Sequence, residues 1–312
     1  MITRRALMTR GGALLLAGAG LAGYSVAIEP NFIIDVTKYA VRPVGWPPGL
    51  RLRIAVISDL HACEPWMPVS RIRQIAAVAN ALAPDLVALL GDFSGGTILA
   101  SAVMPEQWGE ALSSLRAPLG VHAILGNHDW WHGALPQTPG DGAEGVRRAL
   151  RAMGANLMEN DAVRLEKNGE PFWLLGLGDQ MSIQEGPGRW RGHDDLPGTL
   201  NKISDHAPAI LLAHEPFVFS HVPKRIALTL SGHTHGGQIN LPFAGPIFAE
   251  LRFKSKHIYG HIEEDDRHLI ISGGLGESII PARFMRPPEI VLATVEAPTL
   301  TGEASDEILR YN

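Results

Sequence analysis

Residues 50–58 read LRLRIAVIS and run directly into Asp59-Leu60-His61. The second half of this stretch is a continuous run of aliphatic, mostly β-branched side chains, which is typical of a buried strand. The polar residues that follow therefore stand at the carboxyl end of that strand. Ligand sites in open α/β sheets lie beyond such ends. We therefore expect an α/β fold with a polar site next to Asp59 and His61.

Apolar runs followed by polar side chains recur along the chain. Further strands are predicted at residues 85–90, 121–125, 172–177, 210–213, 226–230, 269–272 and 290–295. Helical periodicity is found at residues 71–82, 107–115 and 145–153. Strands and helices alternate early in the chain, and strands dominate late. This order favours helices covering a sheet, and more than one sheet.

Five of the strand ends carry side chains that can bind metal ions. These side chains are Asp59, His61, Asp92, Asn127, His214, His233 and His235. Residues two apart share a face on extended backbone, so Asp59 with His61, and His233 with His235, can each close on one centre. The mixture of oxygen and imidazole donors suits Mn, Fe or Zn in a catalytic site with open water positions. The single cysteine, Cys63, excludes both an internal disulfide and a thiolate zinc site.

Each of these residues also has an ordinary structural role open to it. An aspartate after a strand is commonly a turn residue or a helix N-cap, and an asparagine after glycine is commonly a turn residue. A single histidine is more often hydrogen-bonded than a metal ligand. Packing alone does not explain seven such residues at successive strand ends, so we favour the metal interpretation.

Five motifs in this order resemble those of the calcineurin-like metallophosphoesterases. They are Asp59-Leu60-His61, Gly91-Asp92, Gly126-Asn127-His128-Asp129, Ala213-His214-Glu215-Pro216 and Gly232-His233-Thr234-His235-Gly236-Gly237-Gln238. The resemblance implies a four-layer α/β/β/α sandwich with two mixed sheets and a dinuclear metal site at the strand carboxyl ends. It also implies a metal-dependent hydrolase in which a bridging hydroxide attacks a phosphoric ester.

The resemblance further implies a role for each site residue. Asp59, His61, Asp92 and His235 would hold the first metal ion, and Asp92, Asn127, His214 and His233 the second, with Asp92 shared. His128 would not bind metal but would reach the phosphate or its leaving group. Asp129 would orient the His128 ring, as a carboxylate on the second imidazole nitrogen fixes the tautomer.

The C-terminal part is similar to one bacterial branch of this family, which contains exported and membrane-associated phosphoesterases. The motifs are Gly236-Gly237-Gln238-Ile239, Leu241-Pro242-Phe243, Ser272-Gly273-Gly274-Leu275-Gly276, Pro281-Ala282-Arg283-Phe284 and Pro287-Pro288-Glu289-Ile290. The branch includes enzymes that split the pyrophosphate of UDP-2,3-diacylglucosamine. We therefore expect cleavage of a phosphodiester or pyrophosphate bond, including that of a lipid-linked substrate of this kind. A broad phosphomonoesterase and a non-catalytic metal-binding scaffold are the alternatives.

Residues 1–28 differ in composition from the rest of the chain. Arg4, Arg5 and Arg10 precede an uncharged stretch, residues 11–28, that is rich in Ala, Leu and Gly. This is the composition of an export signal, and the run 3–8 (TRRALM) resembles a twin-arginine signal. We expect export to the periplasm or cell envelope, with cleavage after Ala27. Retention as a membrane anchor and an ordinary buried helix are the alternatives.

The remainder is expected to form one domain over residues 50–297, preceded by a Pro-rich lead-in at 29–49 and followed by a tail at 298–312. The formal net charge of −5 offers no basic field for a nucleic acid, so none is expected as a partner. The expected partners are a phosphate-ester substrate and a membrane surface. The oligomeric state is left open.

Two segments beside the motifs could contact a substrate. Residues 241–248 (LPFAGPIF) form an uncharged stretch that could line an acyl pocket, touch a bilayer or be a buried loop. Trp130-Trp131-His132 could stack on a base or sugar, or pack under a loop. Arg283 could pair with a substrate phosphate or have a structural role.

Overall fold

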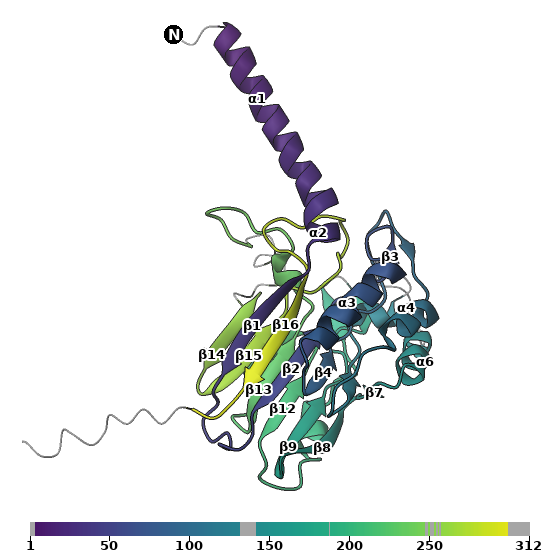
Figure 1. Ribbon diagram of the computed structural model, residues 1–312, viewed down its shortest axis with the longest axis vertical. Helices are drawn as coiled ribbons and strands as arrows, with labels where there is room; N and C mark the ends of the chain where they lie inside the picture. The colour runs from purple at the N-terminus through teal and green to yellow at the C-terminus, as the bar shows by residue number, and fades with distance from the viewer. Residues whose placement is uncertain are drawn as a thin grey trace, which may run out of the picture.

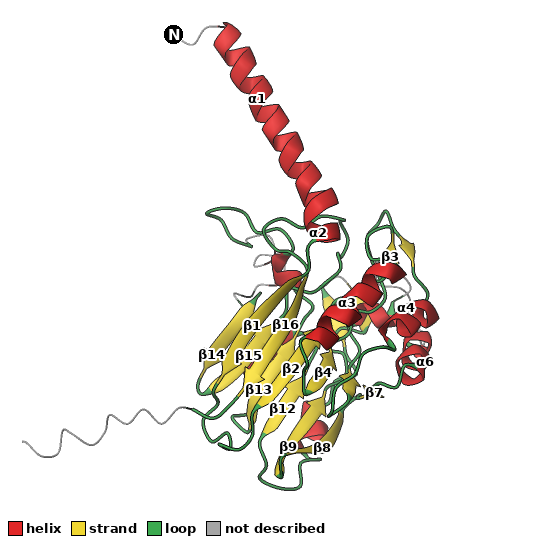
Figure 2. Cartoon of the chain, viewed as in Figure 1, coloured by secondary structure: helices red, strands yellow, loops and turns green. Residues whose placement is uncertain are grey.

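The chain folds into two six-stranded sheets that pack face to face, with helices on the outer sides (Figures 1 and 2). The computed structural model describes residues 4–131, 142–186, 188–246 and 257–298, together with residues 249, 253 and 255. The predicted α/β class and the two mixed sheets are confirmed.

The first sheet has the strand order β1-β16-β2-β4-β6-β7. The strands are β1 (Asp35–Val41), β16 (Glu289–Val295), β2 (Leu52–Ile57), β4 (Leu86–Leu89), β6 (Val121–Ala123) and β7 (Asn156–Leu157). The four strands from β2 to β7 are parallel, β16 is antiparallel to β2, and β1 is parallel to β16. The carboxyl ends of β2, β4 and β6 therefore share one edge with the amino ends of β1 and β16.

The second sheet has the order β14-β15-β13-β12-β9-β8. The strands are β14 (Gly260–Glu264), β15 (Arg267–Ile271), β13 (Ile226–Ser231), β12 (Ala209–Leu212), β9 (Glu170–Gly176) and β8 (Asp161–Lys167). The four inner strands are parallel, and each edge strand pairs antiparallel with its neighbour in sequence. Asn168-Gly169 and Asp265-Asp266 close these hairpins with positive φ at both positions, the geometry that such two-residue turns require.

Alternating side chains on the strands separate the four layers. On β2, Ala55 and Ile57 face the helices, whereas Ile54 and Val56 face the second sheet. The helices on that side are α3 (Val69–Ala81), α4 (Pro105–Leu112) and α6 (Glu144–Ala152). The outer side of the second sheet is covered by α7 (Leu196–Leu200) and the 3-10 helix η2 (Pro216–His221). The four-layer sandwich implied by the sequence resemblance is thus confirmed.

The predicted lead-in at residues 29–49 contains strand β1, which pairs with β16 along its whole length. Its sequence (DVTKYAV) lacks the continuous apolar run of the inner strands, because an edge strand is only partly buried. Of the predicted tail, residues 299–312 lie outside the described part of the chain.

The N-terminus forms a long helix that projects from the sandwich (Figure 1). It comprises α1 (Arg4–Gly23), the π-helical turn η1 (Tyr24–Ile28) and α2 (Glu29–Phe32). Leu15, Leu16 and Leu21 are exposed, so the alternative of an ordinary buried helix is wrong. The segment Arg10–Phe32 is long and apolar enough to cross a membrane, a property that export signals share.

Candidate metal centre

The structure brings all seven predicted ligands to the edge at which the inner strands of both sheets end. Five lie in loops directly after strands: Asp59 and His61 after β2, Asp92 after β4, His214 after β12 and His233 after β13. Asn127 begins the short helix α5 (Asn127–Trp130) after β6, and His235 begins the 3-10 turn η3 (His235–Gly237). The seven side chains are almost completely buried, so their polar atoms depend on one another.

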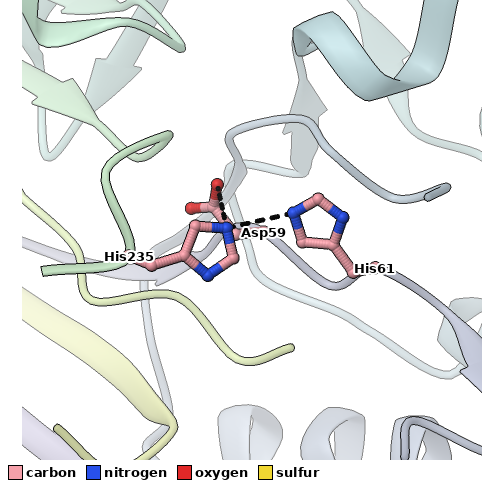
Figure 3. A group of neighbouring side chains, drawn as sticks. All are labelled: Asp59, His61 and His235. Carbon is pink, nitrogen blue, oxygen red and sulfur yellow. Dashed lines mark hydrogen bonds and ion pairs between the residues drawn. The ribbon is translucent and has the colours of Figure 1, made fainter. Parts of the chain in front are cut away.

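Asp59, His61 and His235 form the first cluster (Figure 3). The Nε2 atoms of His61 and His235 are 3.0 Å apart, and His235 Nε2 is 3.6 Å from Asp59 Oδ1. One potential ligand atom from each residue lies within 4.8 Å of the others. The three side chains can therefore bind one ion.

Asp92, His214 and His233 form the second cluster. His214 Nε2 is 3.2 Å from Asp92 Oδ2, and His233 Nδ1 is 2.8 Å from Asn127 Oδ1. Asp92 Oδ2 is also 3.5 Å from His61 Nε2 of the first cluster. The Asp92 carboxylate thus lies between the two clusters.

Backbone carbonyls determine the tautomers of two histidines. His214 Nδ1 is 2.6 Å from the carbonyl of Leu90, and His235 Nδ1 is 3.1 Å from the carbonyl of Gly276. Because a carbonyl only accepts, each Nδ1 donates to it, and Nε2, which faces a carboxylate, is the atom available to a proton or a metal ion. Two electron-rich groups facing each other are stabilised by a cation between them, so the donor set fits metal ions.

Burial and mutual contact shift the pKa values of these groups strongly. Burial lowers the pKa of His61 to about 3 and raises that of Asp59 to about 6. Burial also opposes the charged form of His214, but the Asp92 carboxylate outweighs it and raises the pKa of His214 well above its ordinary value. Without a cation, burial therefore favours the neutral forms of Asp59 and His61, whereas Asp92 and His214 stabilise each other as an ion pair.

Five of the seven predicted ligands have left-handed backbone conformations. The φ values are 53° at Asp59, 45° at His61, 54° at Asp92, 69° at His233 and 53° at His235. The premise that the Asp59–His61 and His233–His235 pairs lie on extended backbone is therefore wrong. Non-glycine residues with positive φ are uncommon and gather at functional sites, where the surrounding packing maintains them.

Glycine is required where the loops of the centre approach one another. A Cβ atom at Gly126 would lie 2.5 Å from Asp92 Oδ1 and 2.6 Å from His214 Cε1. One at Gly232 would collide with Ser58 and Asp59. The absence of side chains at these two positions allows the two clusters to come together.

Asp129 lies in the turn that also carries Asn127 and His128. Its carboxylate accepts hydrogen bonds from the backbone amides of Asp92, Phe93, Ser94 and Gly126, at 2.9–3.1 Å. It therefore fixes the loop that carries Asp92 to the turn that carries Asn127, and its expected role in orienting the His128 ring stays a prediction. Such a carboxylate satisfies amides that a sharp loop leaves without backbone partners.

His128 lies at the centre, as expected. Its backbone amide donates to Asp92 Oδ1 at 2.7 Å. Its ring packs edge-on against His61, with 4.8 Å between centroids, and its centroid is 4.6 Å from that of Trp131. One ring nitrogen of His128, one of His61 and a carboxylate oxygen of Asp92 also lie within 4.8 Å of one another.

A cavity of about 600 Å³ opens over the centre and is lined by Asp92, Asn127, His128, His233 and His235. Its lining also contains Trp131 and Trp190, which stack with 5.2 Å between ring centroids, and Met181. Further lining residues are Ile239, Ile279, Ile280 and Phe253. The cavity therefore combines potential metal ligands with aromatic and aliphatic side chains.

The sequence analysis identified Trp131 at the site but missed Trp190, Met181, Ile279 and Ile280. Trp190 lies on β11 (Arg189–Arg191), which pairs with β10 (Ile183–Gly186), and no motif marks that hairpin. Trp130 stacks instead on His193, with 4.2 Å between centroids. His132, and Ile247 and Phe248 of the 241–248 stretch, lie outside the described residues.

Of the two roles considered for Arg283, binding a substrate phosphate or supporting the structure, the structural one fits its position. It is completely buried and donates to the carbonyls of Gly273 at 3.0 Å and Gly276 at 2.5 Å. Because Gly276 also accepts from His235, Arg283 stiffens the loop that positions this histidine. A substrate phosphate does not reach a guanidinium buried in this way.

Residues 52–237 match the family described as calcineurin-like phosphoesterase. The chain belongs to this family. The resemblance drawn from the five motifs is confirmed, and the chain is a metallophosphoesterase, a hydrolase whose family implies a dinuclear metal site.

Three relatives cover most of the chain. It is 31% identical to the uncharacterized metallophosphoesterase YkuE of Bacillus subtilis, over 91% of this chain and 92% of that protein. It is 29% identical to the UDP-2,3-diacylglucosamine pyrophosphatase LpxG of Chlamydia trachomatis, over 77% and 82%. It is 26% identical to the phosphodiesterase YaeI of Escherichia coli, over 94% and 98%.

Proposed function

We propose that the seven side chains hold two metal ions that share Asp92. Asp59, His61, Asp92 and His235 bind the first ion, and Asp92, Asn127, His214 and His233 bind the second. The observation that carries this assignment is the position of Asp92 Oδ2, which is 3.5 Å from His61 Nε2 and 3.2 Å from His214 Nε2. A carboxylate between two groups of imidazoles is suited to bridging two cations.

When bound, the two ions supply a nucleophilic hydroxide at neutral pH and offset the charge that develops on the phosphoryl oxygens. The protein orients the ligands through carbonyls that hold the Nδ1 atoms of His214 and His235. His128 lines the cavity beside Asp92 and donates a proton or hydrogen bond to the leaving oxygen. Asp129 maintains the loop geometry around both residues.

The substrate class follows from the walls of the cavity. Trp131 and Trp190 offer an aromatic face, and Ile279 and Ile280 offer an aliphatic one. A phosphodiester or pyrophosphate has a group on each side of the scissile phosphate, and the apolar side chains that line the cavity can contact such groups. A lipid-linked pyrophosphate such as UDP-2,3-diacylglucosamine has this form, and LpxG and YaeI are a pyrophosphatase and a phosphodiesterase.

The test is elemental analysis of the full chain, purified in detergent, combined with a substrate panel. We expect two ions per chain and faster hydrolysis of bis-p-nitrophenyl phosphate and UDP-2,3-diacylglucosamine than of p-nitrophenyl phosphate. Asp92→Asn is expected to bind less than one ion. Asp266→Asn, at an exposed turn with positive φ, is the matched control and keeps both.

Retention of both ions by Asp92→Asn would contradict the ligand assignment. Faster cleavage of the monoester would favour a phosphomonoesterase. Inertness of the metal-loaded chain toward all three esters would favour a non-catalytic scaffold.

We also propose that residues 1–28 direct export through the twin-arginine pathway to the periplasm or cell envelope. The support is the pair Arg4-Arg5 ahead of an apolar segment that forms an exposed helix.

A further inference from the structure

The strand topology brings the N-terminal helix to the edge that carries the metal centre. β16 is antiparallel to β2, and β1 is parallel to β16, so β1 begins where β2 ends. Asp59 and His61 follow the end of β2, and α2 ends at Phe32, three residues before β1. The helix therefore leaves the sandwich on the side of the metal centre (Figure 1).

Hydrogen bonds fasten the last turns of this helix to the catalytic loops. The buried carboxylate of Glu29 accepts from the backbone amides of Met285 at 3.0 Å and Arg286 at 2.7 Å. The amide of Arg283 donates to the carbonyl of Ser25 at 2.9 Å. Arg71 on α3 donates to the carbonyls of Asn31 and Ile33. Because these contacts lie on both sides of Ala27, they fix the end of the N-terminal helix to the sandwich.

Large exposed apolar side chains gather on the loops around this junction. We call them the apolar rim, which consists of Ile28, Phe32, Ile98, Leu99, Phe243, Ile280 and Met285. Phe243 is fully exposed, and Leu99 is 72% exposed. A contiguous group of exposed apolar side chains is typical of a surface that binds a protein or a membrane.

Backbone hydrogen bonds place the loops of the apolar rim side by side. The amide of Ile98 donates to the carbonyl of Ile279 at 3.0 Å, which joins the loop of Leu99 to that of Ile280. The amide of Asn240 donates to the carbonyl of Phe284 at 2.8 Å, which joins the loop of Phe243 to that of Met285. Ile280 also lines the cavity, so an apolar path leads from the rim toward the metal centre.

We propose that the helix Arg10–Phe32 is retained as a membrane anchor and that the apolar rim rests on the same bilayer, so that the metal centre opens onto the lipid surface. The occupant of the rim is a bilayer because the rim surrounds the base of the apolar segment Arg10–Phe32, which is long enough to span one. This segment is exposed ahead of its last turn, in which Glu29 and Pro30 are buried. The evidence for this docking geometry is the hydrogen-bonded junction between the helix and the sandwich, together with the apolar rim. Its consequence, a substrate phosphate carried by a lipid, rests on the proposed function.

The test is depth-dependent quenching of fluorescent labels on the full chain, incorporated in vesicles of phosphatidylethanolamine and phosphatidylglycerol with doxyl-labelled lipid. Single cysteines are introduced by Leu99→Cys and Phe243→Cys on the rim. Val44→Cys is the control, because Val44 is equally exposed but follows β1 at the opposite edge. The native Cys63 is buried.

We expect quenching at positions 99 and 243 and none at position 44. We also expect the chain to have its full mass, because the anchor is retained. Equal absence of quenching at all three positions, in vesicles that contain the protein, would overturn the proposal. Loss of the first 27 residues from the envelope-bound protein would also overturn it.

A second measurement separates docking from catalysis. Phe243→Asp and Leu99→Asp should lower hydrolysis of a lipid-borne phosphodiester in vesicles about tenfold, because a charge opposes insertion into the interface. Hydrolysis of soluble bis-p-nitrophenyl phosphate should be unchanged, and Val44→Asp should change neither rate. Equal rates on the lipid-borne ester for all variants would contradict docking. Complete inertness with quenching intact would contradict the proposed function and leave the docking geometry standing.

Discussion

At the residue scale, His128 occupies the centre without being one of the seven proposed ligands. We expect His128→Ala to keep both metal ions and to lose about 10²–10⁴-fold in turnover, because only the proton donor to the leaving group is removed. The measurement is kcat together with metal content. His221→Ala, at an exposed position, is the control and should change neither. Loss of metal from His128→Ala would instead make His128 a ligand.

Asp59 gives the metal-free protein a defined dependence on pH. Burial raises its pKa from 3.8 to about 6, so the folded state favours the neutral carboxyl. This contribution to stability is present below pH 4 and is lost as the pH rises through 6, because an ionised carboxylate must then stay buried. Asp59→Asn removes this contribution, so the metal-free variant should gain about 3 kcal/mol relative to the parent between pH 4 and pH 7.

The measurement is urea unfolding of both full chains in chelator across this pH range. Added metal should reverse the trend for the parent, because a bound cation stabilises the ionised carboxylate and metal affinity rises with deprotonation. Parallel pH profiles for the two metal-free chains would contradict the assigned pKa shift.

At the scale of elements, Asp129 joins the loop after β4 to the start of α5. Asp129→Asn leaves one acceptor oxygen for four amides, so we expect a loss of about 1–3 kcal/mol in stability. Metal affinity should fall about 10–100-fold, because Asp92 and Asn127 are displaced. Asp195→Ala, which removes the side-chain acceptor at the N-cap of α7, is the control and should lose stability without losing metal affinity.

Urea unfolding and metal titration measure the two effects of Asp129→Asn. A variant with native stability and metal affinity but a changed pH profile of kcat would contradict this role. It would indicate that Asp129 acts on the His128 ring, as the sequence resemblance implied.

The inner strands could be predicted from the sequence because each is a continuous apolar run buried on both faces. β2, β4, β9 and β13 are of this kind, and their predicted bounds differ from the observed ones by a few residues. The edge strands β1, β8 and β14 were missed. Their partly exposed side chains follow no apolar run, and pairing with an inner strand decides their conformation.

The composition of the centre could be predicted, but its geometry could not. The motifs predict which residue types stand at the strand ends. The role of each residue as a metal ligand stays a prediction. The left-handed backbone at Asp59 and His235, the amides bound by Asp129 and the aromatic wall at Trp190 arise from packing between distant segments. Such contacts leave no local sequence pattern.

At the scale of the whole molecule, the first strand of the sandwich pairs with the last. β1 and β16 form seven paired positions, and within the described part of the chain β16 is the only strand that pairs with β1. Residues 35–41 therefore find their partner only after residues 289–295 have been synthesised. A chain of this topology completes its first sheet late, which suits an export route that moves folded proteins.

The twin-arginine pair provides the test of this route. Arg4→Lys combined with Arg5→Lys keeps the positive charge of the N-terminus and removes only the guanidinium pair that the pathway recognises. We expect the double variant to accumulate in the cytoplasm, folded and at its full mass of 33.7 kDa, whereas the control Arg10→Lys reaches the envelope. Cell fractionation with immunoblotting measures both. Unchanged localisation of the double variant would show that positive charge ahead of an apolar helix is sufficient, and the chain would then cross the membrane before β1 and β16 can pair.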